Sequence, residues 1–340
     1  MKIAGFDIGG ANTDIAIVDF DESGNIISIE TDFKYLPMWI KKDELKKVLI
    51  DLIGENEINA VGISMTAELV DAYKTKKEGV LDIAQKSRDT FNNIPVGFLG
   101  LDGITEISNV IKDPMNIAAA NWIAAATLAA KINPNCILID TGSTTTDIIP
   151  IINGKEHAKG RSDLERLKTG ELIYSGTLRT NVVTLVDKVP LDGIMTRVAS
   201  ELFAITADIQ MVLDNINEHD YSCSTMDGTG KSVKECMRRI SRIVCGDLNI
   251  LKYNEIIDIA KYIYSIQITR ISEALLEVAE QNNLSNVITT GLGMDIIGAR
   301  ACQKAGLNYI GMDKILKKED CIVAPAVGTA ILMEQYINKK

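Results

Sequence analysis

The sequence lacks paired cysteines, a long apolar run and an excess of basic residues. Its six cysteines form no CxxC pair, and the spacing of Cys223, Cys236 and Cys245 matches no standard zinc pattern. Reduced thiols are typical of the cytoplasm, where we expect the protein to work. Cys136 and Cys321 begin apolar runs, so we expect both thiols to lie in the core.

Histidine and targeting signals are also scarce. The histidines, His157 and His219, lie in hairpin or loop contexts, so we expect surface residues rather than catalysts. Lys2 and Asp7 interrupt the opening apolar run, and no secretion signal is expected. The most hydrophobic helix candidate, 117–130, has 14 residues, whereas a bilayer span needs about 20. It is predicted to be a buried helix.

Basic residues are outnumbered by acidic ones, 36 to 46, which gives a net charge of −10. This balance argues against a nucleic-acid partner and against a membrane surface, although it leaves open a local basic pocket. The 340 residues exceed what one small core organises, so two domains are expected.

One pattern occurs twice along the chain. Residues 6–19 read FDIGGANTDIAIVD and residues 138–151 read LIDTGSTTTDIIPI. In each copy an apolar strand ends in aspartate, a turn of small residues follows, and a second strand begins with another aspartate. Each copy then continues through a turn and a third strand into a helical region. The sequence therefore predicts a duplicated α/β unit with an antiparallel hairpin at its head.

The same signals predict the remaining elements. We expect strands at 2–7, 13–20, 26–33, 60–66, 95–100, 136–140, 146–152, 155–159 and 286–291. We expect helices after Pro37 to about 53, at 69–73 and 80–91, from about 114 to 130, over most of 190–282, and at 328–336. The polar stretch 222–232 interrupts the long helical region.

The repeated turns suit a phosphate group, because small residues let backbone N–H groups approach its oxygens. Neither copy contains GxGxxG or GK[ST], and each turn leads into a strand. The dinucleotide fingerprint and the P-loop, which lead into a helix, are therefore excluded. The flanking carboxylates would repel phosphate unless a cation such as Mg²⁺ lay between them. Two facing copies would grip a diphosphate or triphosphate from both sides. Two ordinary hairpins are the alternative, which the matched order of the copies disfavours.

This pattern resembles the superfamily of actin, the sugar kinases and the heat-shock chaperone ATPases. Residues 288–295, ITTGLGMD, are similar to its adenosine turn, and residues 325–332, PAVGTAIL, to its C-terminal helix that crosses back to the first domain. The resemblance implies an α/β fold of two duplicated RNase H-like domains with mixed sheets and a central cleft. The first domain would comprise 1–115 plus 323–340, and the second 116–322.

Several stretches are similar to one archaeal family related to the hydantoinase and oxoprolinase ATPase subunits. They are MTAELVDAYKTKKEGV (65–80), AAANWIAAA (118–126), LIDTGSTTTDIIPI (138–151), GRSDLERLKTGELIYSGTLRT (160–180), ELFAITADI (201–209) and CGD (245–247). The family is identified as alkyltransferases of methanofuran biosynthesis. The resemblance implies that (5-aminomethylfuran-3-yl)methyl diphosphate gives its carbon to the phenol oxygen of γ-glutamyltyramine. An aryl ether forms and pyrophosphate leaves.

For this chemistry the resemblance implies a metal site and a diphosphate site. Mg²⁺ and preorganised donors would neutralise the departing pyrophosphate. Asp7 and Asp140 are assigned to the metal, with Asp14 and Asp147 behind them. The diphosphate lining comprises Gly9, Gly10, Asn12, Thr13, Gly142, Ser143, Thr144 and Thr145, with Gly291 in the later glycine turn.

The acceptor phenol also needs a proton acceptor, because its unperturbed pKa is about 10. Glu68, Asp71 and Asp208 are each candidates for this base or for binding the aminomethyl cation. A solvated helix face or a cap is the alternative for each. Arg179 is preferred to Lys76 as the cation that meets the pyrophosphate or the acceptor's glutamyl carboxylate. Both could instead be surface charges.

Other roles and functions stay open at this point. Trp122, inside the alanine-rich helix, is expected in the core, while Tyr174 stays unassigned. The same turns would serve an ATP-dependent small-molecule kinase or a hydantoinase-like ATPase, although the GLGM turn is poorer in glycine than the usual adenosine turn. A nucleotide-gated switch would need more partner-binding chain than 340 residues leave. The sequence does not fix the oligomeric state, or whether residues 222–232 form a lid.

Overall fold

The structure is a computed structural model that describes residues 1–339. Its contacts divide the chain into two compact units. Unit 1 comprises residues 1–138, 149–166 and 311–340, and unit 2 comprises 139–148 and 167–310. These bounds differ from the predicted ones because the alanine-rich helix packs on the C-terminal helix within unit 1.

Unit 1 is built on a six-stranded mixed sheet of order β3-β2-β1-β4-β5-β6. Its strands are β1 (Lys2–Ile8), β2 (Asn12–Phe20), β3 (Ile26–Tyr35), β4 (Ala60–Met65), β5 (Val96–Gly100) and β6 (Gly103–Thr105). The first three strands are antiparallel, whereas β4 lies parallel to β1 and β5 parallel to β4. Strands β1 and β4 are almost wholly buried, as expected for central strands covered on both faces.

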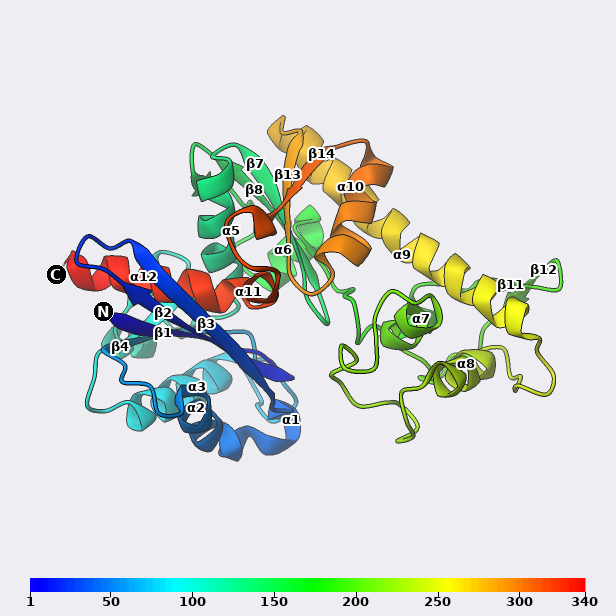
Figure 1. Ribbon diagram of the computed structural model, residues 1–340, viewed down its shortest axis with the longest axis horizontal. Coiled ribbons are helices and arrows are strands. Elements are labelled where there is room, and N and C mark those ends of the chain that lie inside the picture. The colour runs from blue at the N-terminus through cyan, green and yellow to red at the C-terminus, as the bar shows by residue number, and fades with distance from the viewer. Residues whose placement is uncertain (340) are drawn as a thin grey trace. The chain divides into compact units, whose positions relative to one another are not determined.

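Helices cover both faces of this sheet (Figure 1). One face carries α12 (Ala324–Asn338), which packs on β1, β2 and β4. The other carries α2 (Leu45–Ile53) and α3 (Lys76–Thr90). The remaining helices are α1 (Met38–Lys41), α4 (Ile107–Lys112), α5 (Asn121–Ile132), α11 (Lys318–Ile322) and α6 (Asp163–Thr169), which ends in unit 2. Helix α12 is apolar on almost all sides because α5 covers the side that the sheet does not.

The second sheet has the strand order β10-β8-β7-β13-β14, with β9 paired to β8. The strands are β7 (Cys136–Thr141), β8 (Thr146–Ile152), β9 (Lys155–Glu156), β10 (Leu172–Ile173), β13 (Asn286–Thr290) and β14 (Asn308–Gly311). The division between the units falls within β7 and β8. The strand–turn–strand head predicted for each copy is thus present twice, and the predicted α/β class with mixed sheets is confirmed.

The helical part of unit 2 is organised by one long helix, α9 (Tyr253–Asn282). It ends at Asn283, which adopts the left-handed conformation common beyond a helix C-terminus. Helices α7 (Thr206–Val212) and α8 (Val233–Arg242) pack against it, as does α10 (Ala299–Ala305) further along (Figure 1). A small hairpin, β11 (Lys188–Leu191) and β12 (Ile194–Arg197), also contacts α9.

Most predicted elements are confirmed, and the errors concern short ones. The helix predicted at 69–73 is a pair of turns, because five residues are too few for periodicity to separate a helix from a turn. The strand predicted at 155–159 is only Lys155–Glu156, and the helix expected near 114 begins at Asn121. The prediction missed β6, β10 to β12 and β14, all strands of two to four residues, and the short helices α4, α6, α10 and α11.

Among the helices described for residues 1–339, none combines the length and apolar character of a membrane span. Over these residues no group of three or more His, Cys, Asp or Glu side chains is arranged to hold a metal. Cys136 and Cys321 are buried thiols, as predicted. His157 and His219 are exposed, as expected.

Candidate functional site

Turn 1, residues 9–12 of unit 1, joins β1 to β2. The antiparallel register places Asp7 opposite Asp14 at the end of the hairpin. The backbone N–H of Gly9 donates to the carbonyl oxygen of Asn12 at 2.9 Å and closes the turn. A Cβ added at Gly9 would lie 2.8 Å from that same oxygen, so only glycine fits without shifting the turn.

Turn 2, residues 142–145 of unit 2, is closed by the equivalent bond. The N–H of Gly142 donates to the carbonyl of Thr145 at 2.9 Å. A Cβ at Gly142 would meet nothing closer than 3.7 Å, so this glycine is not required by space. The duplication seen in the sequence is therefore a duplication of hydrogen-bonding geometry, although the steric reasons for glycine differ between the two turns.

The tips of both turns present backbone N–H groups without protein acceptors. Within residues 1–339 the structure gives no hydrogen-bond acceptor to the N–H groups of Gly10, Ala11, Ser143 and Thr144. The neighbouring carbonyls, in contrast, are occupied. Gly10 and Ala11 accept from the N–H groups that follow β3, and Gly142 and Ser143 accept from residues 177–179. Successive free amides of this kind form an anion-binding concavity.

Asp7 is held by two side chains that the sequence did not single out. Ser64 Oγ, on β4, donates to Asp7 Oδ1 at 2.8 Å, and Asn121 Nδ2, at the start of α5, donates to Oδ2 at 3.1 Å. Donors on both oxygens fix the position of the carboxylate. Local patterning could not reveal these partners, because they lie 57 and 114 residues away along the chain.

Asp140, at the end of β7, is packed against the late glycine turn. Gly291 has φ +86°, and a Cβ there would lie 2.3 Å from Asp140 Oδ1. Gly293 N–H donates to the Thr141 carbonyl at 2.8 Å. The predicted cofactor-binding glycine, Gly291, therefore lies beside the predicted metal ligand Asp140. The Thr141 and Thr177 hydroxyls nearby are buried and have no hydrogen-bond partner among residues 1–339.

The segment of residues 175–180 packs against turn 2 and donates hydrogen bonds to it. Backbone N–H groups of Leu178 and Arg179 donate to the Ser143 carbonyl at 3.0 and 2.9 Å. The Arg179 guanidinium reaches Thr144 Oγ1 at 3.4 Å. The structure thus brings the predicted cation Arg179 to turn 2. Tyr174, just before the segment, is 69% exposed.

Glu68 is a buried carboxylate with an unusual environment. Its side chain is 1% exposed, and neither oxygen accepts a hydrogen bond from residues 1–339. Burial raises the pKa of Glu68 to about 7, while the nearby ammonium of Lys76, 3.6 Å from Oε1, acts in the opposite direction. Lys76 is shared with Asp163, whose Oδ2 lies 3.0 Å from its Nζ. A carboxylate with this pKa is suited to accept a proton near neutral pH.

Asp208, another candidate base, has the contacts of a structural residue. It is fully buried, and its Oδ1 lies 2.8 Å from the Arg239 guanidinium and 3.1 Å from Tyr221 Oη. Its Oδ2 accepts from the backbone of Ile205 at 3.1 Å. These bonds join α7 to α8. Contacts within the protein therefore explain why this aspartate is buried, and no substrate is needed. Asp71 is exposed.

The aromatic prediction for α5 is confirmed. Trp122 is 1% exposed and belongs to the core of unit 1. The guanidinium groups of Arg166 and Arg161 lie 5.1 and 5.7 Å from its ring centroid, within the range of cation–π attraction. The indole therefore stacks with the protein's own cations rather than with an incoming aromatic substrate.

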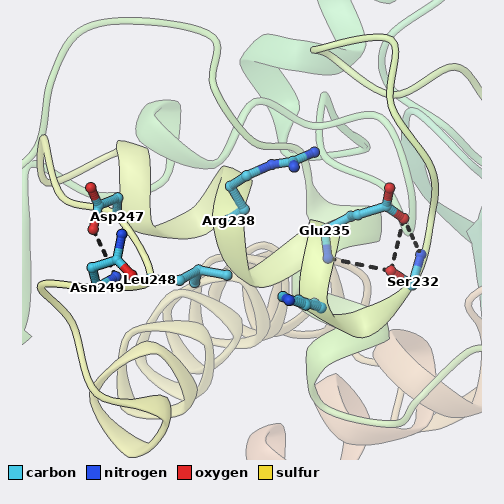
Figure 2. Close-up of a pocket in the computed structure, with 7 residues that line it drawn as sticks. Ser232, Glu235, Arg238, Asp247, Leu248 and Asn249 are labelled. Carbon is cyan, nitrogen blue, oxygen red and sulfur yellow. Dashed lines mark hydrogen bonds between the residues drawn. The ribbon is translucent and has the colours of Figure 1, made fainter.

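A surface depression of about 520 Å³ lies at the start of α8 (Figure 2). Its lining comprises Ser232, Lys234, Glu235, Arg238, Asp247, Leu248 and Asn249. Ser232 and Glu235 are engaged in a reciprocal cap of the helix, and Asp247 accepts from the backbone of Asn249. None of the residues that the sequence assigned to the reaction lines this depression.

The donor set of each turn fits a magnesium ion that keeps several waters. Asp7 and Asp140 each contribute one carboxylate beside a turn with free amides. Mg²⁺ is usually held through one or two carboxylates plus water and substrate phosphate, and it does not require a cage of three protein ligands. The residues present are therefore compatible with Mg²⁺ bound together with a diphosphate.

Comparison with known proteins places this chain in a family. The hydantoinase/oxoprolinase family profile matches residues 59–336. A protein of Methanocaldococcus jannaschii named (4-{4-[2-(gamma-L-glutamylamino)ethyl]phenoxymethyl}furan-2-yl)methanamine synthase is 39% identical over 341 aligned positions, covering 100% of this chain and 99% of the relative. A protein of the same name from Methanococcus vannielii is 41% identical over 216 positions, covering 63% of this chain and 97% of the relative.

A solved structure supports the fold. The nucleotide-free structure of acetone carboxylase superimposes with a TM-score of 0.61, covering 97% of this chain and 70% of the other, at 11% sequence identity. At this identity the likeness concerns the fold alone.

Proposed function

We propose, from the premise that this chain belongs to the hydantoinase/oxoprolinase family and within it to the methanofuran-pathway synthases, that it forms the same aryl ether as those synthases. The relatives' name describes a product in which a phenoxymethyl link joins a phenol to a furan ring. The chain covers almost the full length of the relative from Methanocaldococcus jannaschii. The reaction is therefore a condensation in methanofuran biosynthesis.

The donor in this proposal is (5-aminomethylfuran-3-yl)methyl diphosphate, and the acceptor is γ-glutamyltyramine. The phenol oxygen forms a bond to the furan-bound CH₂ carbon. The bond between that carbon and the diphosphate oxygen breaks, and its electron pair leaves with pyrophosphate. The phenol proton passes to a base. No phosphoryl group is transferred, so the reaction consumes no ATP.

One observation supports the diphosphate site above all others. Each turn presents two successive backbone N–H groups without an acceptor among residues 1–339, beside a strand that carries an aspartate next to its last residue. Such donors are fixed before the reaction, so they stabilise the charge that develops on the leaving pyrophosphate without reorganisation. We assign diphosphate oxygens to these amides and to Arg179 beside turn 2.

Mg²⁺, when bound, would supply neutralising positive charge for the diphosphate. The carboxylates proposed to hold Mg²⁺, directly or through water, are Asp7 beside turn 1 and Asp140 beside turn 2. Ser64 and Asn121 keep the Asp7 carboxylate in place. Glu68 is the candidate base whose environment suits the role. The Glu68 side chain is 1% exposed, whereas the side chain of its neighbour Lys76 is 21% exposed. The acceptor phenol would therefore reach the Glu68 carboxylate from the side on which Lys76 lies.

The test is a reaction with both substrates, Mg²⁺ and no nucleotide, followed by mass spectrometry. The ether should form together with pyrophosphate. An acceptor carrying ¹⁸O in its phenol should retain the label in the ether, because the phenol oxygen is the nucleophile. A strict requirement for ATP, or loss of the ¹⁸O from the product, would contradict the proposal. ATP dependence would favour the kinase or ATPase alternative.

A further inference from the structure

The support of turn 2 converges on the carbonyl of Gly176. This oxygen accepts from Gln267 Nε2 at 2.9 Å and from Thr206 Oγ1 at 3.1 Å. The Cα of Gly176 lies against the turn, because an added Cβ would come within 2.6 Å of the Thr144 backbone nitrogen. Residues from α7 and α9 therefore hold a glycine that is in direct backbone contact with the proposed diphosphate site.

Gln267 is a buried polar side chain with one unpaired polar atom. It is 1% exposed in the middle of α9, and its Oε1 has no hydrogen-bond partner among residues 1–339. An unpaired buried amide oxygen costs stability. Its Nε2, however, donates both to Ser175 Oγ and to the Gly176 carbonyl, each at 2.9 Å. Both acceptors belong to the 175–180 segment, so the hydrogen bonds of the Gln267 amide hold this segment in position.

Two peptide groups connect Gln267 to the tip of turn 2. The Gly176–Thr177 peptide accepts from Gln267 at its carbonyl and donates through Thr177 N–H to the Gly142 carbonyl at 2.9 Å. The Gly142–Ser143 peptide accepts there and presents the N–H of Ser143 on its other side, because carbonyl and N–H point in opposite directions in a trans peptide.

Hydrogen bonds in such a chain polarise one another. Each bond strengthens the next by roughly 10–30% in a site of low dielectric constant. The donor on α9 therefore affects the Ser143 N–H in two ways. It fixes the direction of this N–H through the position of Gly176, and it increases the positive charge on the hydrogen through the two peptides.

We infer that Gln267 is a positioning residue of turn 2, which acts through Gly176 and Thr177 to aim and polarise the Ser143 N–H toward a diphosphate. The inference rests on the proposed function, since it assigns a diphosphate to turn 2. Gln267 itself touches no substrate.

The test uses magnesium pyrophosphate as the probe and isothermal titration calorimetry as the measurement. Gln267→Met keeps the approximate volume and removes the donor. Gln210→Met is the matched control, because Gln210 is equally buried in α7 and its hydrogen bond goes to Asn215 rather than to the 175–180 segment. We expect the Kd of Gln267→Met to rise about tenfold, as for the loss of one strong hydrogen bond, while the control binds like the unaltered protein.

A second measurement reads the amide directly. In protein labelled with ¹⁵N-serine, the Ser143 amide proton should move upfield in ligand-free Gln267→Met and stay in place in the control. Thr206→Val, which removes a second donor to the Gly176 carbonyl, should weaken pyrophosphate binding in the same direction.

Equal losses in Gln267→Met and Gln210→Met, or an unchanged Ser143 amide with unchanged affinity, would overturn the inference. Neither measurement needs the ether product. A failed ether assay with these results intact would refute the proposed reaction and leave the positioning role of Gln267 standing. Absence of any pyrophosphate binding by the unaltered protein would refute both.

Discussion

Replacing Gly291 by alanine should disable the site by moving one carboxylate. Gly291 has φ +86°, and an added Cβ would lie 2.3 Å from Asp140 Oδ1 and 2.6 Å from the Thr141 carbonyl oxygen. Real Cβ atoms do not approach oxygens so closely, so the Asp140 side chain or the late glycine turn must move. Gly306→Ala is the matched control, because Gly306 has φ +70° and nothing within 4 Å of an added Cβ.

The two variants share one cost and differ in another. A side chain held at positive φ costs roughly 1–2 kcal/mol, which both variants incur. Only Gly291→Ala also displaces Asp140. If Asp140 holds the cation that neutralises pyrophosphate, the loss should resemble removal of one preorganised group in an active site, about 100-fold or more in kcat. Gly306→Ala should keep its kcat.

The assays are thermal unfolding, the rate of ether formation, and calorimetric titration with magnesium pyrophosphate. We expect a lower Tm in both variants, with loss of turnover and of pyrophosphate affinity in Gly291→Ala only. Unaltered turnover and affinity in Gly291→Ala would show that the position of Asp140 does not matter to the reaction. Equal functional losses in both variants would show that backbone strain, rather than the displaced carboxylate, is responsible.

Three further predictions concern the turns and the buried acid. Gly9→Ala should lower Tm, because its Cβ would lie 2.8 Å from a backbone oxygen. Gly142→Ala, whose Cβ would lie 3.7 Å from the nearest atom, should unfold like the unaltered protein. Equal Tm values in the two variants would show that steric contact does not make glycine necessary at position 9. Arg179→Met should weaken pyrophosphate binding by about 10- to 100-fold if a charge-assisted hydrogen bond is lost, with partial recovery in Arg179→Lys; unchanged calorimetry would remove Arg179 from the site. Burial raises the pKa of Glu68 to about 7 from 4.5, so the folded state binds this proton more tightly and stability falls as pH rises through that window. Glu68→Gln should abolish this fall, about 3 kcal/mol between pH 4.5 and 7; urea titrations that keep the same pH dependence in the variant would contradict the assignment.

The sequence predicted the two turns because their signal is local. An apolar strand, an aspartate, small residues and a second aspartate all lie within 14 residues, and the hairpin bonds that they form are short-range. The late glycine turn was found for the same reason. Its role was less predictable, because the contact between Gly291 and Asp140 joins strands that are far apart in the chain.

The parts that the sequence could not reveal are the supporting contacts. Ser64 and Asn121 meet Asp7, and Gln267 meets Gly176, across separations of 57 to 114 residues. Nothing in the local pattern of a strand or helix marks a polar residue as the partner of a distant backbone group. Likewise, the residues next to Glu68 in the sequence do not show how deeply it is buried, and burial is the main cause of its raised pKa.

The two turns share their closing hydrogen bond but differ in what fixes their shape. In turn 1, glycine is required by contact with Asn12, and the tip carbonyls are held by the chain that follows β3. In turn 2, the glycine has room, and the shape depends on the 175–180 segment, which Gln267 and Thr206 hold from the helical region. A change at Thr206 or Gln267 can therefore alter turn 2 and leave turn 1 intact. If the proposed function is right, changes at these two residues should affect the diphosphate through turn 2 alone.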